Sequence, residues 1–234
     1  MAEETKGDSA VVEDPLYYII EVMRQNETFL RQNAEETYHE VVELINDAID
    51  YVVLAAKKSG EDYVRYSMIS FLNHILMPFS YAIHVDTLAG NIPACFMELR
   101  LMLESLVKCY LADLEYPDRT FFQERLKLLE DENLSTSELM KDLGRKLELG
   151  NAFVALWSKL SQNWIHTKGI MDGVVAQVIE KSDVPPWGLV LPMRYSEREL
   201  DTLDELRNNI SKFISLLKTT MEKYQKENNL TMAD

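Results

Sequence analysis

The feature that most constrains the fold is an almost wholly apolar segment, 93–111, which nevertheless carries Glu98, Arg100 and Glu104. Leu, Met, Ala and Glu favour helix, and the apolar side chains recur at spacings of three and four. Further apolar residues cover most of the other faces, so we expect a central helix surrounded by neighbours. An ionised side chain there needs a partner. Arg100 and Glu104 are four residues apart and can pair, either as a structural clip or as part of a site.

Helical patterns follow one another along the chain, with no alternating strand pattern and no internal repeat. Pro78 predicts a kink, because a proline inside a helix loses a hydrogen bond and clashes with the preceding turn. Ser135 with Glu138, and Ser196 with Glu199, have the spacing of capping boxes. We expect helices at about 15–29, 35–58, 61–89, 93–111, 117–129, 135–147, from 152 to about 167, and 196–226. The sequence therefore predicts an all-α multi-helix bundle with long antiparallel helices and a long C-terminal helix.

The sequence also predicts the domain organisation. Residues 1–14 are expected to be a disordered acidic tail, 15–226 a single all-helical domain, and 227–234 a frayed tail. Within the domain, the prolines of 169–195 forbid a long helix, so this stretch is predicted to be an irregular loop. A functional lid and a simple covering loop remain open as interpretations.

The charge balance restricts the partners. With 24 basic and 39 acidic residues the net charge is −15, and a field of that sign repels phosphate backbones. DNA binding and docking on an anionic membrane are therefore disfavoured, and RNA binding would need a local basic patch. Apolar runs are interrupted by charges before they reach membrane-spanning length, and the first residues lack the pattern of a secretory signal. We expect a cytoplasmic protein, whose Cys95 and Cys109 are buried small hydrophobes rather than a disulfide.

A stripe of carboxylates lies along one face of the predicted helix 35–58. Its members, spaced by three and four, are Glu36, Glu40, Glu43, Asp47 and Asp50. One interpretation is a ligand set for Mg²⁺ in a metal-dependent helical nucleotide hydrolase. The other is a solvated outer face of an amphipathic helix, opposite Tyr38, Val42, Ile45 and Ile49. Val41, Val52 and Val53 are also expected to point inward.

The predicted helix that ends near Thr167 carries a second polar strip. Lys159, Asn163 and His166 share a face beside an aromatic stripe, and His166 lies near the helix C-terminus, where a protonated imidazole is favoured. The strip could supply a general base or an RNA contact. Alternatively His166 is satisfied by hydrogen bonds or by a carboxylate such as Glu104. The spacing of the four histidines in the chain matches no zinc or di-iron motif.

Two short motifs resemble those of helical proteins related to the HEPN superfamily, including abortive-infection-type members. They are Leu-Arg-x-x-Leu-Glu at Leu99, Arg100, Leu103 and Glu104, and Leu-Ser-x-x-x-x-His at Leu160, Ser161 and His166. The resemblance covers roughly 60–180. It implies a helical fold, a dimer, and a metal-independent ribonuclease that uses an Arg and a His on one helix. Here Lys159 stands in place of that Arg, so the resemblance implies either a ribonuclease acting through His166 and Lys159 or an inactive relative.

These observations lead to three hypotheses. The first is a cytoplasmic all-α interaction or regulatory domain, homodimeric through a long helix, in which Arg100, Glu104 and His166 form a buried polar cluster. The second is the HEPN-like ribonuclease or its inactive relative. The third is the metal-dependent hydrolase that uses the acidic stripe. No cofactor is expected.

Overall fold

The structure is a computed structural model that describes residues 15–56, 60–164 and 193–227. Within these ranges every regular element is helical, so the predicted all-α bundle is confirmed. The predicted tail 1–14 lies outside the described residues, as do 228–234 and most of the predicted irregular loop.

The predicted helices are present, with shifted boundaries. They are α1 (Pro15–Asn33), α2 (Glu35–Ala56), α3 (Gly60–Arg65), α4 (Ser67–Phe71), the π-helical turn η1 (Leu72–Leu76), α5 (Met77–Ala89), α6 (Ile92–Glu115), α7 (Phe122–Asp131), α8 (Thr136–Lys146), α9 (Ala152–Trp164), the 3-10 turn η2 (Glu197–Glu199) and α11 (Leu200–Glu227).

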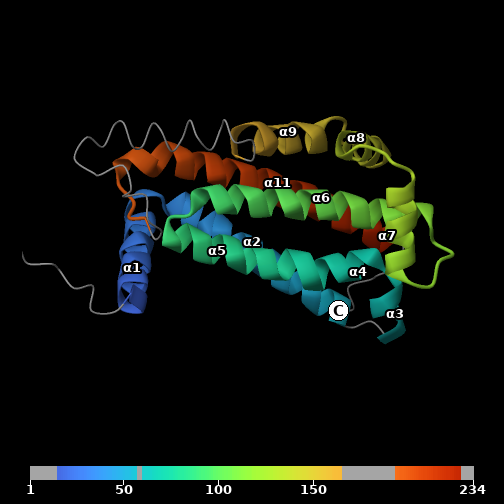
Figure 1. Ribbon diagram of the computed structural model, residues 1–234, viewed down its shortest axis with the longest axis horizontal. Helices are drawn as coiled ribbons and strands as arrows, with labels where there is room; N and C mark the ends of the chain where they lie inside the picture. Colours follow the sequence, from blue (N-terminus) through green and yellow to red (C-terminus); the bar gives the residue numbers. More distant parts are fainter. Residues whose placement is uncertain (1–14, 57–59, 165–192, 228–234) are drawn as a thin grey trace, which may run out of the picture.

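Helix α6 is the centre of the bundle. It packs against α4, α5, α7, α8, α9 and α11, and Phe96, Leu99 and Leu103 on it are fully buried. Figure 1 shows α2, α5, α6 and α11 running along the long axis, with α1 standing across one end and α7 at the other. The expected central helix is therefore present, but one strip of it stays open, since Met97 and Leu101 are 45% and 41% exposed.

The predicted helix 61–89 is interrupted at Tyr66, a break that the periodicity did not indicate. Tyr66 has an extended backbone (φ −99°, ψ 123°), and helix α4 begins directly after it. The predicted kink at Pro78 takes the form of the π-helical turn η1, which immediately precedes α5. A wider turn is a usual way to accommodate a proline that lacks an N–H group.

The continuous run Ser67–Ala89 has the length and composition to cross a membrane, with a mean hydropathy of 1.2. It packs against α2 and α6 and contributes Met68, Leu76 and Ile83 to the core. Since a core helix of a bundle meets the same criteria, this run alone is weak evidence for a membrane span.

Both predicted capping boxes are confirmed. Glu138 accepts a hydrogen bond from the Ser135 N–H (2.8 Å) at the start of α8. Glu199 accepts one from the Ser196 N–H (2.7 Å) before α11. Each box satisfies backbone donors that the first turn of a helix leaves free, so these two helix starts are encoded locally.

Asn26 of α1 ties the start of the C-terminal region to the rest of the bundle. Its Nδ2 donates to the carbonyl oxygens of Leu88 and Met193, both at 2.8 Å, and its Oδ1 accepts from the Tyr195 N–H at 2.9 Å. The side chain is only 1% exposed. One amide thus joins α1, the end of α5 and the segment before α11.

Candidate functional site

The expected pair on α6 forms the first polar cluster, which also includes a residue of α9. The Arg100 Nε donates to Glu104 Oε1 at 2.8 Å, and the Trp157 Nε1 donates to the same oxygen at 2.7 Å. The guanidinium carbon lies 5.5 Å from the centre of the Trp157 ring, within cation–π range. The Arg100 and Glu104 side chains are 23% and 22% exposed, so the cluster fastens α9 to α6 at the edge of the core.

The predicted polar strip of α9 is only partly described. His166 lies outside the described residues, and Asn163 is placed only by its backbone in α9. Lys159 points to the other flank of α9 from Trp157, because two helical positions are about 200° apart, and its Nζ lies 3.3 Å from Glu205 Oε1 on α11. Lys159 is therefore not brought together with Arg100 and Glu104.

The acidic stripe of α2 borders α11 but stays mostly exposed: the Glu36 and Glu43 side chains are 78% and 52% exposed, and that of Asp47 is 12% exposed. Glu36 forms an ion pair with Arg207, while Glu43 and Asp47 lie 3.7 and 3.2 Å from the Lys218 Nζ. Burial outweighs Lys218 and raises the pKa of Asp47. The partners are thus basic side chains, and the described ranges contain no group of three or more His, Cys, Asp or Glu arranged to hold a metal ion.

The buried line of α2 lies between the acidic and apolar stripes, at Thr37, Val41, Leu44, Ala48 and Ala55. The expectation that Val53 points inward is wrong, since it is 54% exposed. The reason is that α2 packs between α5 and α11. Because α11 covers part of the carboxylate side of α2, the buried line is shifted toward that side.

A second polar cluster lies at the far end of α6 and was not predicted. Asp113 accepts from the backbone N–H groups of Ser67 and Met68 (2.8 and 2.9 Å), from Arg125 Nη1 (3.0 Å) and from the Tyr224 hydroxyl (2.7 Å). The Arg125 and Asp113 side chains are 1% and 2% exposed. Because Asp113 also caps α4, this cluster joins α4, α6, α7 and α11.

Arg125 is satisfied on its other side by backbone groups. Its Nη2 donates to the carbonyl oxygens of Pro117 and Arg119, at 2.9 and 2.8 Å. These bonds fix the connection between α6 and α7. The second polar cluster is almost completely buried, which is typical of a structural element rather than of a reactive site.

Glu98 is the third carboxyl group of interest on α6. Burial, together with the nearby Asp86 carboxylate of α5, raises its pKa to about 8. The Glu98 Oε2 is buried and accepts no hydrogen bond within the described ranges. At neutral pH this side chain is therefore mostly uncharged.

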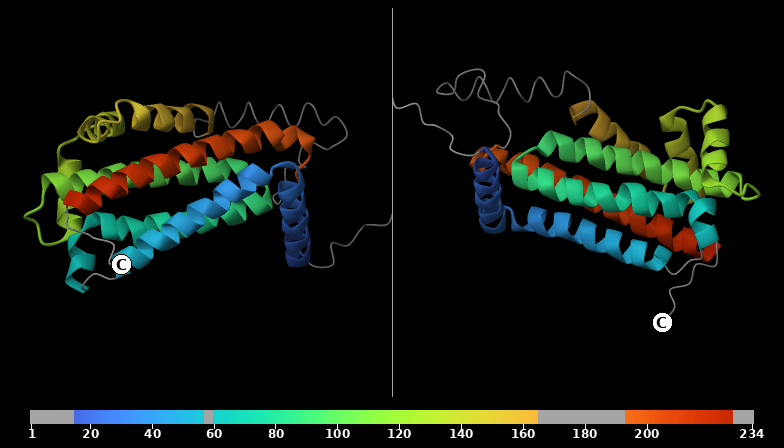
Figure 2. Two further views of the ribbon diagram at one scale, coloured as in Figure 1. Left: turned by 180° about the vertical axis from the view of Figure 1, so that it is seen from behind. Right: turned by 60° about the horizontal axis from the view of Figure 1, so that its bottom comes forward.

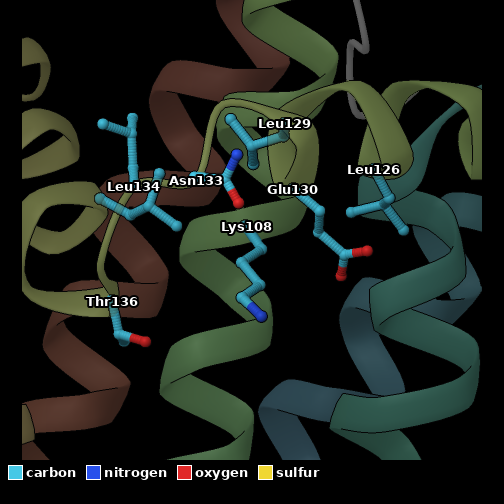
Figure 3. Close-up of a pocket in the computed structure, with 8 residues that line it drawn as sticks. Lys108, Leu126, Leu129, Glu130, Asn133, Leu134 and Thr136 are labelled. Atoms are coloured by element: carbon cyan, nitrogen blue, oxygen red, sulfur yellow. The ribbon is translucent and has the colours of Figure 1, made fainter.

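One pocket of about 270 Å³ lies among α6, α7 and α8. Figure 3 shows Lys108 of α6 between Glu130 of α7 and Thr136 of α8. None of the residues that line this pocket has a buried polar atom without a hydrogen-bond partner. We therefore assign the pocket no function.

No protein-family model matches this chain, and no curated protein and no solved structure matches it either.

Proposed function

We propose that this chain is an all-α interaction module that forms a homodimer. The main support is the exposure of apolar side chains at the start of α1. The consecutive residues Tyr17, Tyr18, Ile19 and Ile20 are 66%, 42%, 38% and 42% exposed. Four consecutive helical residues cover all sides of a helix, because each advances by about 100°. A helix that is apolar on all sides is typical of one covered by other surfaces.

These four residues are called the α1 arm. The rest of the same helix packs against α2 and α5. Val22 and Leu30 are fully buried there, and Asn26 is nearly so. Figures 1 and 2 show α1 standing across the end of the bundle, with its first turns extending beyond it. The packed part of α1 therefore holds the α1 arm away from the bundle.

A second uncovered apolar surface lies on the hairpin of α5 and α6. The α5/α6 patch consists of Tyr81 (45% exposed), Val85 (50%), Met97 (45%) and Leu101 (41%). The two pairs are each spaced by four and lie at matching distances from the connection near Gly90. They therefore form a contiguous strip along two adjacent helices.

Charge restricts the surfaces through which two copies of this chain can meet. Copies that each carry −15 repel one another over most of their surface. The α1 arm and the α5/α6 patch contain no charged residue; Asp86 and Glu98 flank the patch, and burial together with Asp86 raises the pKa of Glu98 to about 8. Like-charged copies can therefore approach most easily through these surfaces.

Reciprocal exchange satisfies both surfaces at once. In a twofold dimer, a contact from arm to patch in one direction requires the same contact in the other. Each copy then buries its arm on the partner and its patch under the partner's arm.

Sedimentation velocity on the full chain across a micromolar range tests the proposal. We expect a dimer for the wild type, and about tenfold weaker association for Ile20→Gln in the arm and for Leu101→Gln in the patch. Val53→Gln is the matched control, because Val53 is a 54% exposed apolar residue on α2 outside both surfaces. It should associate like the wild type.

Two results would overturn the proposal. One is a wild-type chain that remains monomeric throughout, including one that instead floats with zwitterionic lipid vesicles and thus uses the arm on a membrane. The other is a dimer weakened equally by Val53→Gln and Ile20→Gln, which would place the interface elsewhere.

A further inference from the structure

Two acidic side chains meet beside the α5/α6 patch. Asp86 follows the patch residue Val85 on α5, and Glu98 follows the patch residue Met97 on α6. The two carboxyl groups share a side-chain hydrogen bond where the two helices pack together. Two carboxyl groups can form such a bond only when one of them carries a proton. The intact pair therefore holds one proton and one negative charge.

The surroundings assign the proton to Glu98. The Asn91 Nδ2 donates to Asp86 Oδ1 at 3.0 Å, and a hydrogen bond of this kind stabilises the ionised form of Asp86. Glu98 Oε2, by contrast, is buried and accepts no hydrogen bond from any residue that the structure describes. Because an ionised carboxyl group without donors is costly to bury, burial and the neighbouring Asp86 raise the pKa of Glu98 to about 8.

Among the described residues, Asp86 is the only charged group that acts on Glu98. Arg100 lies on the other flank of α6, next to α9, and Lys159 of α9 is 3.3 Å from Glu205 of α11. The other titratable groups near the pair are the Cys95 thiol and the Tyr195 hydroxyl, and burial raises the pKa of both. Both are therefore uncharged at neutral pH, and a second negative charge on the pair has no counter-ion.

We propose that the Asp86–Glu98 pair makes dimerisation depend on pH, so that a partner's α1 arm covers the α5/α6 patch only while Glu98 is protonated. This inference rests on the proposed homodimer. Covering the patch removes further water from the pair, and a second charge there would be buried without a partner. Dimerisation therefore favours the protonated form of Glu98, and the dimer is lost as the pH rises through the pKa of that group.

Sedimentation velocity on the full chain at about pH 7 and about pH 9 tests the inference. With a pKa of about 8, most copies hold the Glu98 proton at the lower pH and about one in ten holds it at the higher pH. We expect the wild-type dissociation constant to rise at least about tenfold. Glu98→Gln cannot ionise, so its dissociation constant should be nearly the same at both. Asp50→Asn is the matched control, because Asp50 is an exposed carboxylate on α2 outside both surfaces, and it should retain the wild-type dependence.

Asp86→Asn tests the pair itself. The substitution removes the negative neighbour but leaves Glu98 buried, so the pH at which the dimer is lost should fall. A purely structural role of Asp86 would instead weaken the dimer at every pH without moving that midpoint, and this result would contradict the inference.

Two further results would overturn the inference and leave the homodimer in place. One is a wild-type dissociation constant that is equal at the two pH values. The other is a Glu98→Gln dimer that is lost at high pH as the wild type is. A wild-type chain that is monomeric at both pH values would instead overturn the proposed homodimer, and the inference with it.

Discussion

Two of the ion pairs that involve helix α6 differ in the spacing of their partners and in their exposure to solvent. Arg100 and Glu104 are one helical turn apart and remain more than 20% exposed. Asp113 and Arg125 come from different helices and are at most 2% exposed. The first pair is visible in the sequence spacing, and the second is not. The Arg100–Glu104 pair therefore supports one helix contact, between α6 and α9, whereas the Asp113–Arg125 pair belongs to a cluster that joins four helices.

The physical reason is desolvation. Taking a carboxylate and a guanidinium out of water is costly, and their attraction offsets the cost only when the remaining hydrogen-bonding positions are also filled. Asp113 meets this condition through Ser67, Met68, Arg125 and Tyr224. Removing one member leaves the others without their partners.

The largest expected effect therefore comes from breaking the buried pair. Arg125→Met should lower the free energy of unfolding by about 3–5 kcal/mol, because it leaves the Asp113 carboxylate buried without its counter-ion. Urea denaturation measures the loss. Arg145→Met is the control, because its pair with Asp142 leaves the Arg145 side chain 80% exposed, and a change within about 0.5 kcal/mol is expected. Equal effects of the two substitutions would contradict the contrast drawn between buried and exposed pairs.

Breaking the exposed pair should cost less. Arg100→Met and Trp157→Phe each remove one hydrogen bond to Glu104 Oε1, and each should cost about 1 kcal/mol. Because both donors share one acceptor, the double variant should differ from the sum of the single variants. Strict additivity in urea denaturation would mean that the cluster does not act as a unit.

The last effect concerns Glu98 and is seen only as a dependence of stability on pH. Its folded-state pKa of about 8 lies above the ordinary value of 4.5, so the folded chain holds a proton that the unfolded chain releases between these values. This contribution to stability is present at low pH and is lost as pH rises toward 8.

Glu98→Gln should remove that dependence. Relative to the wild type, its melting temperature should rise steadily between pH 4.5 and 8, because the wild type loses stability over this range and the glutamine does not titrate. Melting curves at low protein concentration separate this effect from dimerisation. A difference that stays constant with pH would show that Glu98 does not titrate in this range.

The sequence predicted what depends on local pattern. The helices follow from apolar spacing, and the two capping boxes follow from Ser and Glu three residues apart, since all the interacting groups lie within one turn. The Arg100–Glu104 pair was predictable for the same reason. The lone acid Asp113 on the buried face of an apolar helix was an available signal, but its partners are separated by 12 to 111 residues.

What the sequence did not predict depends on how helices pack. The buried line of α2 is set by α11, which supplies Arg207 and Lys218 to the carboxylates, and this placed Val53 outside. The break at Tyr66 is stabilised by a carboxylate 46 and 45 residues from the two N–H groups that it caps. The pairing of Lys159 with Glu205 likewise required knowing which helix lies beside α9.

The Asn26 junction has a consequence for the order of events during synthesis. Its amide bonds to Met193, which is 167 positions further along the chain. At about 5–20 residues per second, the ribosome takes roughly 8 to 30 seconds to span that interval. During that interval α1 is held by its packing on α2 and α5 and by the bond from Asn26 to Leu88, while the bonds of Asn26 to Met193 and Tyr195 are still unmade. The junction therefore closes only after most of the bundle has been synthesised.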